Sequence, residues 1–131
     1  MKRIMMIDDD PDDRSIFYDA LKTLNINAEY ITAENGEEAY EMISRPDFLP
    51  PDMIFVDLYM PKMNGYDFVI KMRQLSWYKH IPTYIYTSCT STHEKINCLT
   101  AGATGFVIKQ FKDSDLAREL SNVMPRYGES A

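Results

Sequence analysis

Residues 53–65 read MIFVDLYMPKMNG and give the clearest indication of the fold. Its first four residues, Met53 to Val56, form a short apolar run between Pro51 and Pro61. Such a run is typical of a buried strand in a parallel sheet rather than of a helix. Asp57 follows at the point where this strand should end. Open parallel sheets bind ligands just outside the carboxyl ends of their strands, so we predict that Asp57 faces a functional site. A solvated aspartate that opens a loop would give the same local pattern.

Length and composition limit the classes of protein to consider. With 131 residues, the chain is long enough for one domain with one full core. Its net charge of -6 argues against sequence-independent nucleic-acid binding, which depends on basic surface, and favours a cation as the first partner. No stretch approaches the length that crosses a membrane, so we expect no membrane partner. Cys89 and Cys98 form neither a disulfide framework nor a metal-ligand spacing, which favours a reducing cytoplasm as the location.

The rest of the chain alternates strand and helix patterns. The predicted strands are Lys2–Ile7, Ala28–Thr32, Met53–Val56, Thr83–Thr87 and Gly105–Lys109. A helix is expected after each strand, with Asp12 or Asp13 capping the first and Asp113 or Ser114 capping the last. Crossovers of this length return the chain to the same sheet and cover both of its faces. We therefore predict an α/β fold with a doubly wound, five-stranded parallel sheet and five helices.

Polar groups follow four of these strands. They are Asp8 and Asp9, Asp57, Thr87 and Lys109. The carboxyl ends of the strands converge on one crevice, so these side chains should meet there. Three carboxylates suit a hard cation such as Mg²⁺, and a hydroxyl and an ammonium suit phosphoryl oxygens. Each residue also has an ordinary structural explanation as a helix-capping acid, a strand threonine or a surface lysine, but all of these would have to coincide.

In this order and spacing the chain resembles a response-regulator receiver domain of two-component signalling, of the size of the stand-alone chemotaxis regulators. The motifs that carry the resemblance are Ile7-Asp8-Asp9, Val56 to Pro61 with Gly65, Thr87-Ser88, Ala101 to Phe106, and Lys109. The resemblance covers essentially the whole chain. It implies the flavodoxin-like strand order 2-1-3-4-5, a receiver domain over residues 1–125, and a short tail over 126–131 without an output domain.

The resemblance also implies a chemistry. Asp57 would accept a phosphoryl group from a sensor histidine kinase, a phosphotransfer protein or a small donor such as acetyl phosphate. Asp8, Asp9, Asp57 and the backbone carbonyl of Tyr59 would hold Mg²⁺ or Mn²⁺. The protein would then be a signalling phosphoacceptor that assists its own phosphorylation and dephosphorylation, and not an enzyme. Phosphoryl transfer needs alignment and charge neutralisation more than acid-base chemistry, which agrees with these roles.

The remaining roles concern the phosphate and the output of the signal. Thr87 would bond a phosphoryl oxygen, and Lys109 would pair with the Asp57 carboxylate and then with its phosphate. Thr87 and Phe106 would form the switch, which changes the face made by the fourth helix, the fifth strand and the fifth helix. A downstream partner protein would read that face, so phosphorylation would shift a two-state equilibrium. Plain core packing is the other interpretation of Phe106.

One residue departs from the family pattern, and two others lie at positions that tune the lifetime of the phosphate in the family. The family usually has proline after the lysine of the fifth strand, often with a cis bond, whereas this chain has Gln110. A cis bond before a residue other than proline costs about 2.5–4 kcal/mol, so we predict a trans Lys109-Gln110 bond and an altered loop. Tyr59 and Cys89 should lie at the rim of the pocket and tune the phosphate lifetime. A partner-docking role for Tyr59 is the alternative.

Two other functions compete with this interpretation. An aspartate-nucleophile phosphohydrolase also uses Mg²⁺ and an aspartate after a strand. That family places a second aspartate two residues after the nucleophile, where this chain has Tyr59, which counts against it. The other is a phosphorylation-independent adaptor built on a receiver fold. The complete set of polar residues argues against an adaptor, while Gln110 keeps it open.

Overall fold

The computed structural model describes residues 2–88, 91–110 and 112–124. Five strands form one parallel sheet, namely β1 (Lys2–Ile7), β2 (Ala28–Ala33), β3 (Met53–Asp57), β4 (Thr83–Thr87) and β5 (Gly105–Ile108). Their order in the sheet is β2-β1-β3-β4-β5. The predicted sheet and its strand order are confirmed. Cys89 and the tail expected at residues 126–131 lie outside the described residues.

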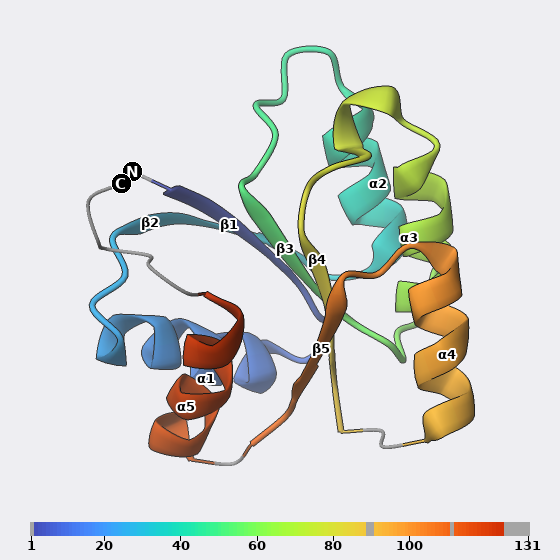
Figure 1. Ribbon diagram of the computed structural model, residues 1–131. Helices are drawn as coiled ribbons and strands as arrows, with labels where there is room; N and C mark the ends of the chain where they lie inside the picture. The colour runs from blue at the N-terminus through green and yellow to red at the C-terminus, as the bar shows by residue number, and fades with distance from the viewer. Residues whose placement is uncertain (1, 89–90, 111, 125–131) are drawn as a thin grey trace.

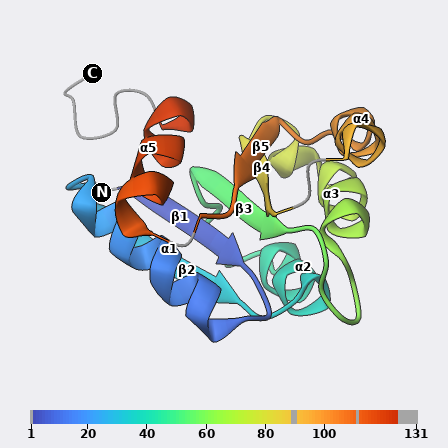
Figure 2. The same ribbon diagram turned by 90° about the horizontal axis from the view of Figure 1, so that it is seen from below.

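Helices cover both faces of the sheet. They are α1 (Pro11–Thr23), α2 (Gly36–Ser44), α3 (Gly65–Arg73), α4 (Thr92–Ala101) and α5 (Asp113–Val123), with a short 3-10 helix, η1 (Ser76–Tyr78), after α3. α1 and α5 lie on one face, and α2, α3 and α4 lie on the other (Figures 1 and 2). In the part of the chain that is described, no helix is long and apolar enough to span a membrane.

Two hydrophobic cores fill the spaces between the sheet and its helices. On the α1/α5 face, the Phe17 ring lies 4.9 Å from the Phe55 ring and 5.5 Å from the Tyr86 ring, measured between centroids. On the other face, Ile54 and Val56 pack in a core with residues of α2, α3 and α4. Side chains of a strand alternate between the faces, so Phe55 and Ile54 necessarily enter different cores.

The same alternation decides the face on which each polar strand-end residue lies. Met6 and Phe55 belong to the core on the α1/α5 face, as does Val107. Asp8 and Asp57 are two residues beyond the first pair, and Lys109 is two residues beyond Val107, so all three continue on this face. Their side chains therefore meet near the start of α1, at the edge where the strands end, which is the lower edge of the sheet in Figure 1.

The start of α1 differs from the sequence prediction. Asp10, and not Asp12 or Asp13, is the N-cap residue, and its side chain accepts a hydrogen bond from the Asp12 backbone N–H at 2.9 Å. Pro11 occupies the first helical turn, where the missing N–H costs nothing because that group would have no intrahelical partner. Asp13 therefore lies within the helix, where its carboxylate is not used as the cap.

The start of α5 also differs from its prediction. Lys112 occupies the N-cap position, so the cap expected at Asp113 or Ser114 was placed too late in the chain. Lys112 makes no side-chain capping hydrogen bond. α5 therefore begins without the side-chain cap that stabilises most helix starts, and its position depends on packing against α1 and β5.

Gly65 fixes the path of the chain after β3. The Gly65 N–H donates a hydrogen bond to the Leu58 carbonyl at 3.0 Å, which folds the segment back against the end of β3. A Cβ atom at this position would lie 2.4 Å from the Asp57 carbonyl oxygen, so any side chain would push the two backbones apart. Because glycine has no Cβ atom, the backbone at Gly65 can approach the backbone at Asp57 this closely.

Candidate functional site

Three carboxylates meet at the carboxyl ends of β1 and β3. Ile7 pairs with Val56 in the sheet, so the residues that follow, Asp8 and Asp57, are neighbours. Asp9 joins them, and one carboxylate oxygen from each of the three residues lies within 4.8 Å of the others. Asp8 and Asp57 are buried, whereas Asp9 is exposed. The arrangement offers oxygen ligands that are open to solvent on one side, as Mg²⁺ requires when it keeps several waters.

Lys109 forms ion pairs with two of these three acids and with one further aspartate. Lys109 Nζ lies 3.1 Å from Asp8 Oδ2 and 3.4 Å from Asp57 Oδ2. It lies closest, at 2.8 Å, to Oδ2 of Asp13 in the first turn of α1. The ammonium also lies 5.3 Å from the centroid of the Tyr86 ring, close enough for a cation–π contact. The sequence interpretation placed Lys109 at this site but missed Asp13.

The pKa values of the site residues reflect burial first and an excess of negative charge second. Burial raises the pKa of Asp57 to about 7, and the charge of Asp8 adds to this effect, while Lys109 opposes it. Burial likewise raises the pKa of Asp8. Burial acts to lower the pKa of Lys109, but its hydrogen bond to Asp13 and the charges of Asp57 and Asp8 raise it overall. One ammonium therefore does not compensate these carboxylates.

A divalent cation fits this charge imbalance. Within the described residues, the buried Oδ2 atom of Asp8 accepts no hydrogen bond, although it forms the ion pair with Lys109. Buried carboxylate oxygens without hydrogen bonds are costly, and coordination of a metal would satisfy them. The donor set of carboxylate oxygens is the one that hard cations such as Mg²⁺ and Mn²⁺ prefer.

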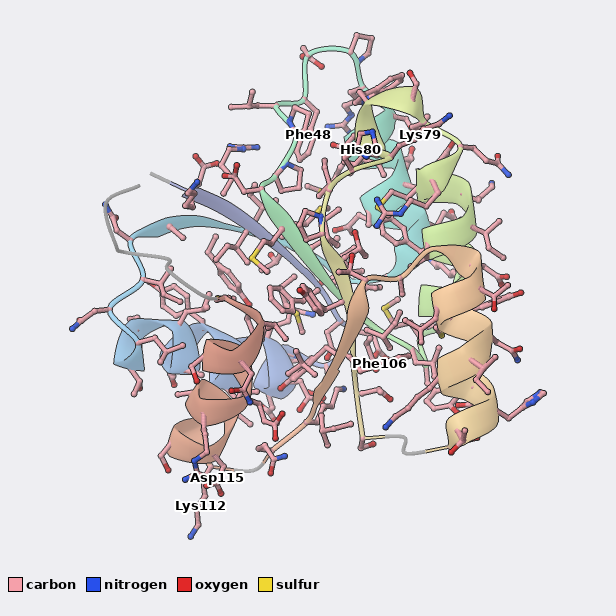
Figure 3. All side chains as sticks on the ribbon, in the orientation of Figure 1. Phe48, Lys79, His80, Phe106, Lys112 and Asp115 are labelled. Carbon is pink, nitrogen blue, oxygen red and sulfur yellow. The ribbon has the colours of Figure 1, made fainter. Side chains whose placement is uncertain are left out.

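The residues expected at the switch lie on neighbouring strands. Thr87 is buried and follows Tyr86, the residue of β4 that pairs with Asp57. Phe106 is partly buried and pairs with Ile85, two residues before Thr87, so it lies closer to the amino ends of the strands than the acidic group does. The Phe106 ring faces α4, where Lys95 Nζ lies 5.7 Å from its centroid (Figure 3). Cys89, expected at the rim, lies outside the described residues.

Two clefts flank the acidic group. One, of about 180 Å³, lies between the segment after β3 and α4, and is lined by Tyr59, Tyr66 and Glu94 among others. The Tyr59 hydroxyl donates a hydrogen bond to Glu94, a contact that the sequence did not indicate, and the Tyr59 side chain is 57% exposed. The other cleft, of about 290 Å³, is lined by Asp13, Ile16, Ser88, Lys109 and Gln110.

The Lys109-Gln110 bond is trans, as predicted, because the described residues contain no cis peptide bond. Lys109 nevertheless reaches Asp57, at 3.4 Å, and its backbone N–H donates to the Thr87 carbonyl at 2.9 Å. Replacing the usual proline by Gln110 therefore leaves the lysine within the acidic group.

Comparison with known proteins identifies the family of this chain. The family model for the response regulator receiver domain matches residues 4–121. The chain belongs to this family. The receiver domain accounts for nearly all of the described residues, and its members are parts of two-component systems.

Individual relatives show how widely receiver domains of this kind are used. The chain is 34% identical over 108 residues to the sensor histidine kinase CheAY of Helicobacter pylori, a match that covers 82% of this chain but only 13% of that kinase. It is 30% identical over 123 residues to the two-component response regulator ORR11 of Oryza sativa, covering 93% of this chain and 80% of that protein.

Among solved structures, the chemotaxis response regulator CheY4 of Vibrio cholerae matches with a TM-score of 0.79 and 31% identity. The match covers 95% of this chain and 99% of that one. The receiver fold of this chain is therefore the fold of a chemotaxis-type response regulator.

Proposed function

We propose that this receiver domain accepts a phosphoryl group on Asp57 in a two-component phosphorelay. The observation that carries the proposal is the convergence of Asp8, Asp9 and Asp57 within 4.8 Å, with Lys109 Nζ 3.4 Å from Asp57. An aspartate nucleophile needs neighbours that neutralise the charge of an incoming phosphoryl group, and Lys109 is such a neighbour. The donor would be a phosphohistidine of a sensor kinase or phosphotransfer protein, or acetyl phosphate.

The transfer itself is a displacement at phosphorus. A carboxylate oxygen of Asp57 forms a new bond to phosphorus, while the bond from phosphorus to the donor's nitrogen or oxygen breaks. The donor leaves with that electron pair, as a histidine ring that takes a proton from solvent or as acetate. Lys109 then follows the negative charge from the Asp57 carboxylate to the phosphoryl oxygens. Thr87, at the end of the neighbouring strand, would donate its hydroxyl hydrogen bond to one of these oxygens.

Asp8, Asp9 and Asp57 would hold Mg²⁺ or Mn²⁺ together with the backbone carbonyl of Tyr59. When bound, the ion supplies positive charge that offsets the phosphoryl oxygens and orders them. The carboxylates would position that charge next to the nucleophile, while the burial of Asp8 and Asp57 keeps competing water away from one side of the site. The buried, hydrogen-bond-deficient Oδ2 atom of Asp8 supports this assignment.

The signal would leave through the surface of α4, β5 and α5. Phe106 lies between β5 and α4, so a movement of Thr87 towards the phosphate would open space into which an aromatic ring can turn. A downstream protein that binds the rearranged face would shift the equilibrium towards it. We place this exchange in the cytoplasm, where two-component partners act. The position of Lys109 beside Asp57 supports this active receiver over the adaptor alternative.

The test is the intact mass of the protein after incubation with acetyl phosphate. We expect a phosphoryl adduct on the wild-type protein that requires Mg²⁺ and is absent from Asp57→Ala. Asp52→Ala, at the opposite end of β3, is the matched control and should be labelled like the wild type. An adduct of equal yield on Asp57→Ala would refute the assignment. No adduct, when a control receiver is labelled in parallel, would support the adaptor.

A further inference from the structure

The ammonium of Lys109 lies closest to a carboxylate that has no part in the proposed phosphoryl transfer. The distance from Lys109 Nζ to Asp13 Oδ2 is 2.8 Å, shorter than its distances to Asp8 and Asp57. The side chain of Asp13 is 26% exposed, whereas that of Asp57 is 8% exposed. Lys109 thus contacts the buried nucleophile and the more exposed first turn of α1 together, and its shortest distance is to α1.

We propose that Asp13 is a positioning residue that holds Lys109 against α1 before phosphorylation and thereby slows transfer to Asp57. The inference rests on the proposed function, which makes Lys109 the charge partner of the phosphoryl group on Asp57. An ammonium has only three protons to donate, and its attraction to an anion falls with distance. Lys109 must therefore loosen its contact with Asp13 as it approaches an incoming phosphoryl group.

The local structure explains why Asp13 can act in this way. Asp10 already caps α1, so the Asp13 carboxylate is not needed at the helix start. Among the described residues, Lys109 is the only cation that forms an ion pair with Asp13. Strand alternation brings Lys109 to the face of the sheet that α1 covers, where this pair forms.

The surroundings leave room for the ammonium to move. Asp13 and Lys109 both line the cleft of about 290 Å³ that extends past Ser88 and Gln110. An ammonium on a four-carbon stem reorients by rotation about several bonds, so a shift from Asp13 towards Asp57 needs no backbone movement. The Lys109 side chain is 19% exposed, which places the pair partly in solvent and keeps the restraint weak enough to be released.

The experiment compares initial rates of labelling by acetyl phosphate, followed by intact mass at saturating Mg²⁺. We expect Asp13→Asn to be labelled several-fold faster than the wild type, because Lys109 is no longer shared with α1. Asp12→Asn removes the same charge from the neighbouring exposed position and should remain near the wild-type rate. Asp13→Glu keeps the carboxylate and should return the rate towards that of the wild type. A merely structural role for Asp13 would leave the rate unchanged or lower it.

An Asp13→Asn rate no greater than that of Asp12→Asn would overturn the inference. If the wild type is not labelled at all, the proposed function fails instead, and a second measurement still tests the pair. Urea unfolding midpoints of the wild type, Asp13→Asn, Lys109→Met and the double variant form a double-mutant cycle. We expect Asp13→Asn to lower the midpoint more in the wild type than in the Lys109→Met background. Equal shifts in the two backgrounds would show that Asp13 does not hold Lys109.

Discussion

Charged residues are paired differently at the two ends of the parallel sheet. At the amino end, the Arg3 guanidinium pairs with Glu29 and also donates to the Leu49 carbonyl at 2.7 Å. Asp52, just before β3, accepts the Arg3 backbone N–H at 2.7 Å. Arg3, Glu29 and Asp52 therefore each have a partner at this end, although the buried Nε atom of Arg3 makes no hydrogen bond within the described residues.

At the carboxyl end, the balance is different. Asp8, Asp13 and Asp57 share one ammonium, that of Lys109, and Asp9 adds a further carboxylate. Burial and mutual repulsion raise the pKa of Asp57 to about 7. The same sheet thus carries an ion pair that supports the fold at one end and an uncompensated charge at the other. The difference supports the proposal that the carboxyl end of the sheet binds a cation and a phosphoryl group.

The largest expected contrast comes from removing the cation at each end. Lys109→Ala should lower the rate of labelling by acetyl phosphate by about a hundredfold, because a group that neutralises transition-state charge is lost. Arg3→Ala should leave that rate near the wild-type value and lower the free energy of unfolding by about 0.5–1.5 kcal/mol, since Glu29 and the Leu49 carbonyl lose their hydrogen-bond donor. Labelling rates and urea unfolding of both variants test the contrast, which fails if both variants slow labelling to the same degree.

The acids at the two ends should differ in their effect on metal binding. Asp9→Asn removes an exposed ligand and should weaken Mg²⁺ binding by about tenfold or more. Glu29→Gln, at the amino end of the sheet, should leave the affinity unchanged. Titration calorimetry with MgCl₂ measures both. Equal affinities for Asp9→Asn and the wild type would place the cation elsewhere.

The pH dependence of stability should report the uncompensated charge. The folded-state pKa of Asp57, about 7, is above its ordinary value, so the folded state binds more protons than the unfolded state between these values. The contribution of Asp57 is therefore present at low pH and is lost as the pH rises towards 7 and above. In EDTA, the urea midpoint of Asp57→Asn should rise relative to that of the wild type between pH 5 and pH 7.5. A difference in urea midpoint that stays constant with pH would contradict the raised pKa of Asp57. Added Mg²⁺ should make the pH dependence of this difference smaller.

The smallest effect is expected at the rim of the site. Tyr59 lines the cleft between the segment after β3 and α4, and its hydroxyl donates a hydrogen bond to Glu94 of α4. Tyr59→Ala should therefore admit water and hasten loss of the phosphoryl group several-fold, as followed by intact mass after removal of acetyl phosphate. Tyr66→Ala, in the same cleft, is the control. If Tyr59→Ala loses phosphate no faster than the wild type, a docking role for Tyr59 becomes the better interpretation.

Strand periodicity and the strand-end rule made most of the fold predictable. The apolar run before Asp57 indicated a buried strand, and the structure places β3 there with all of its residues buried. The order of the elements then fixed which side chains follow a strand, which is why Asp8, Asp57 and Lys109 could be grouped before their distances were known. These features depend on local pattern and on a general property of parallel sheets.

The contacts of Asp13 and Tyr59 could not be predicted in the same way. Residues 8–13 contain five aspartates, and several of them could cap a helix, so the phase of α1 was undetermined until Asp10 proved to be the cap. The position at which α1 begins determines which of its side chains face the site. Together with the face of the sheet on which Lys109 lies, this position brings Asp13 next to the ammonium. Tyr59 and Glu94 are 35 positions apart, and no local pattern links them.

The central claim is that Asp57 carries the phosphoryl group, and its most direct test is to locate the modified residue. Borohydride reduces an acyl phosphate to an alcohol, which converts a phosphorylated aspartate to homoserine. Protein labelled with acetyl phosphate and Mg²⁺ would be reduced, digested and sequenced by tandem mass spectrometry. The account predicts homoserine at position 57, and none when Mg²⁺ is replaced by EDTA. Homoserine at another aspartate, or labelled protein in which position 57 remains aspartate, would contradict it.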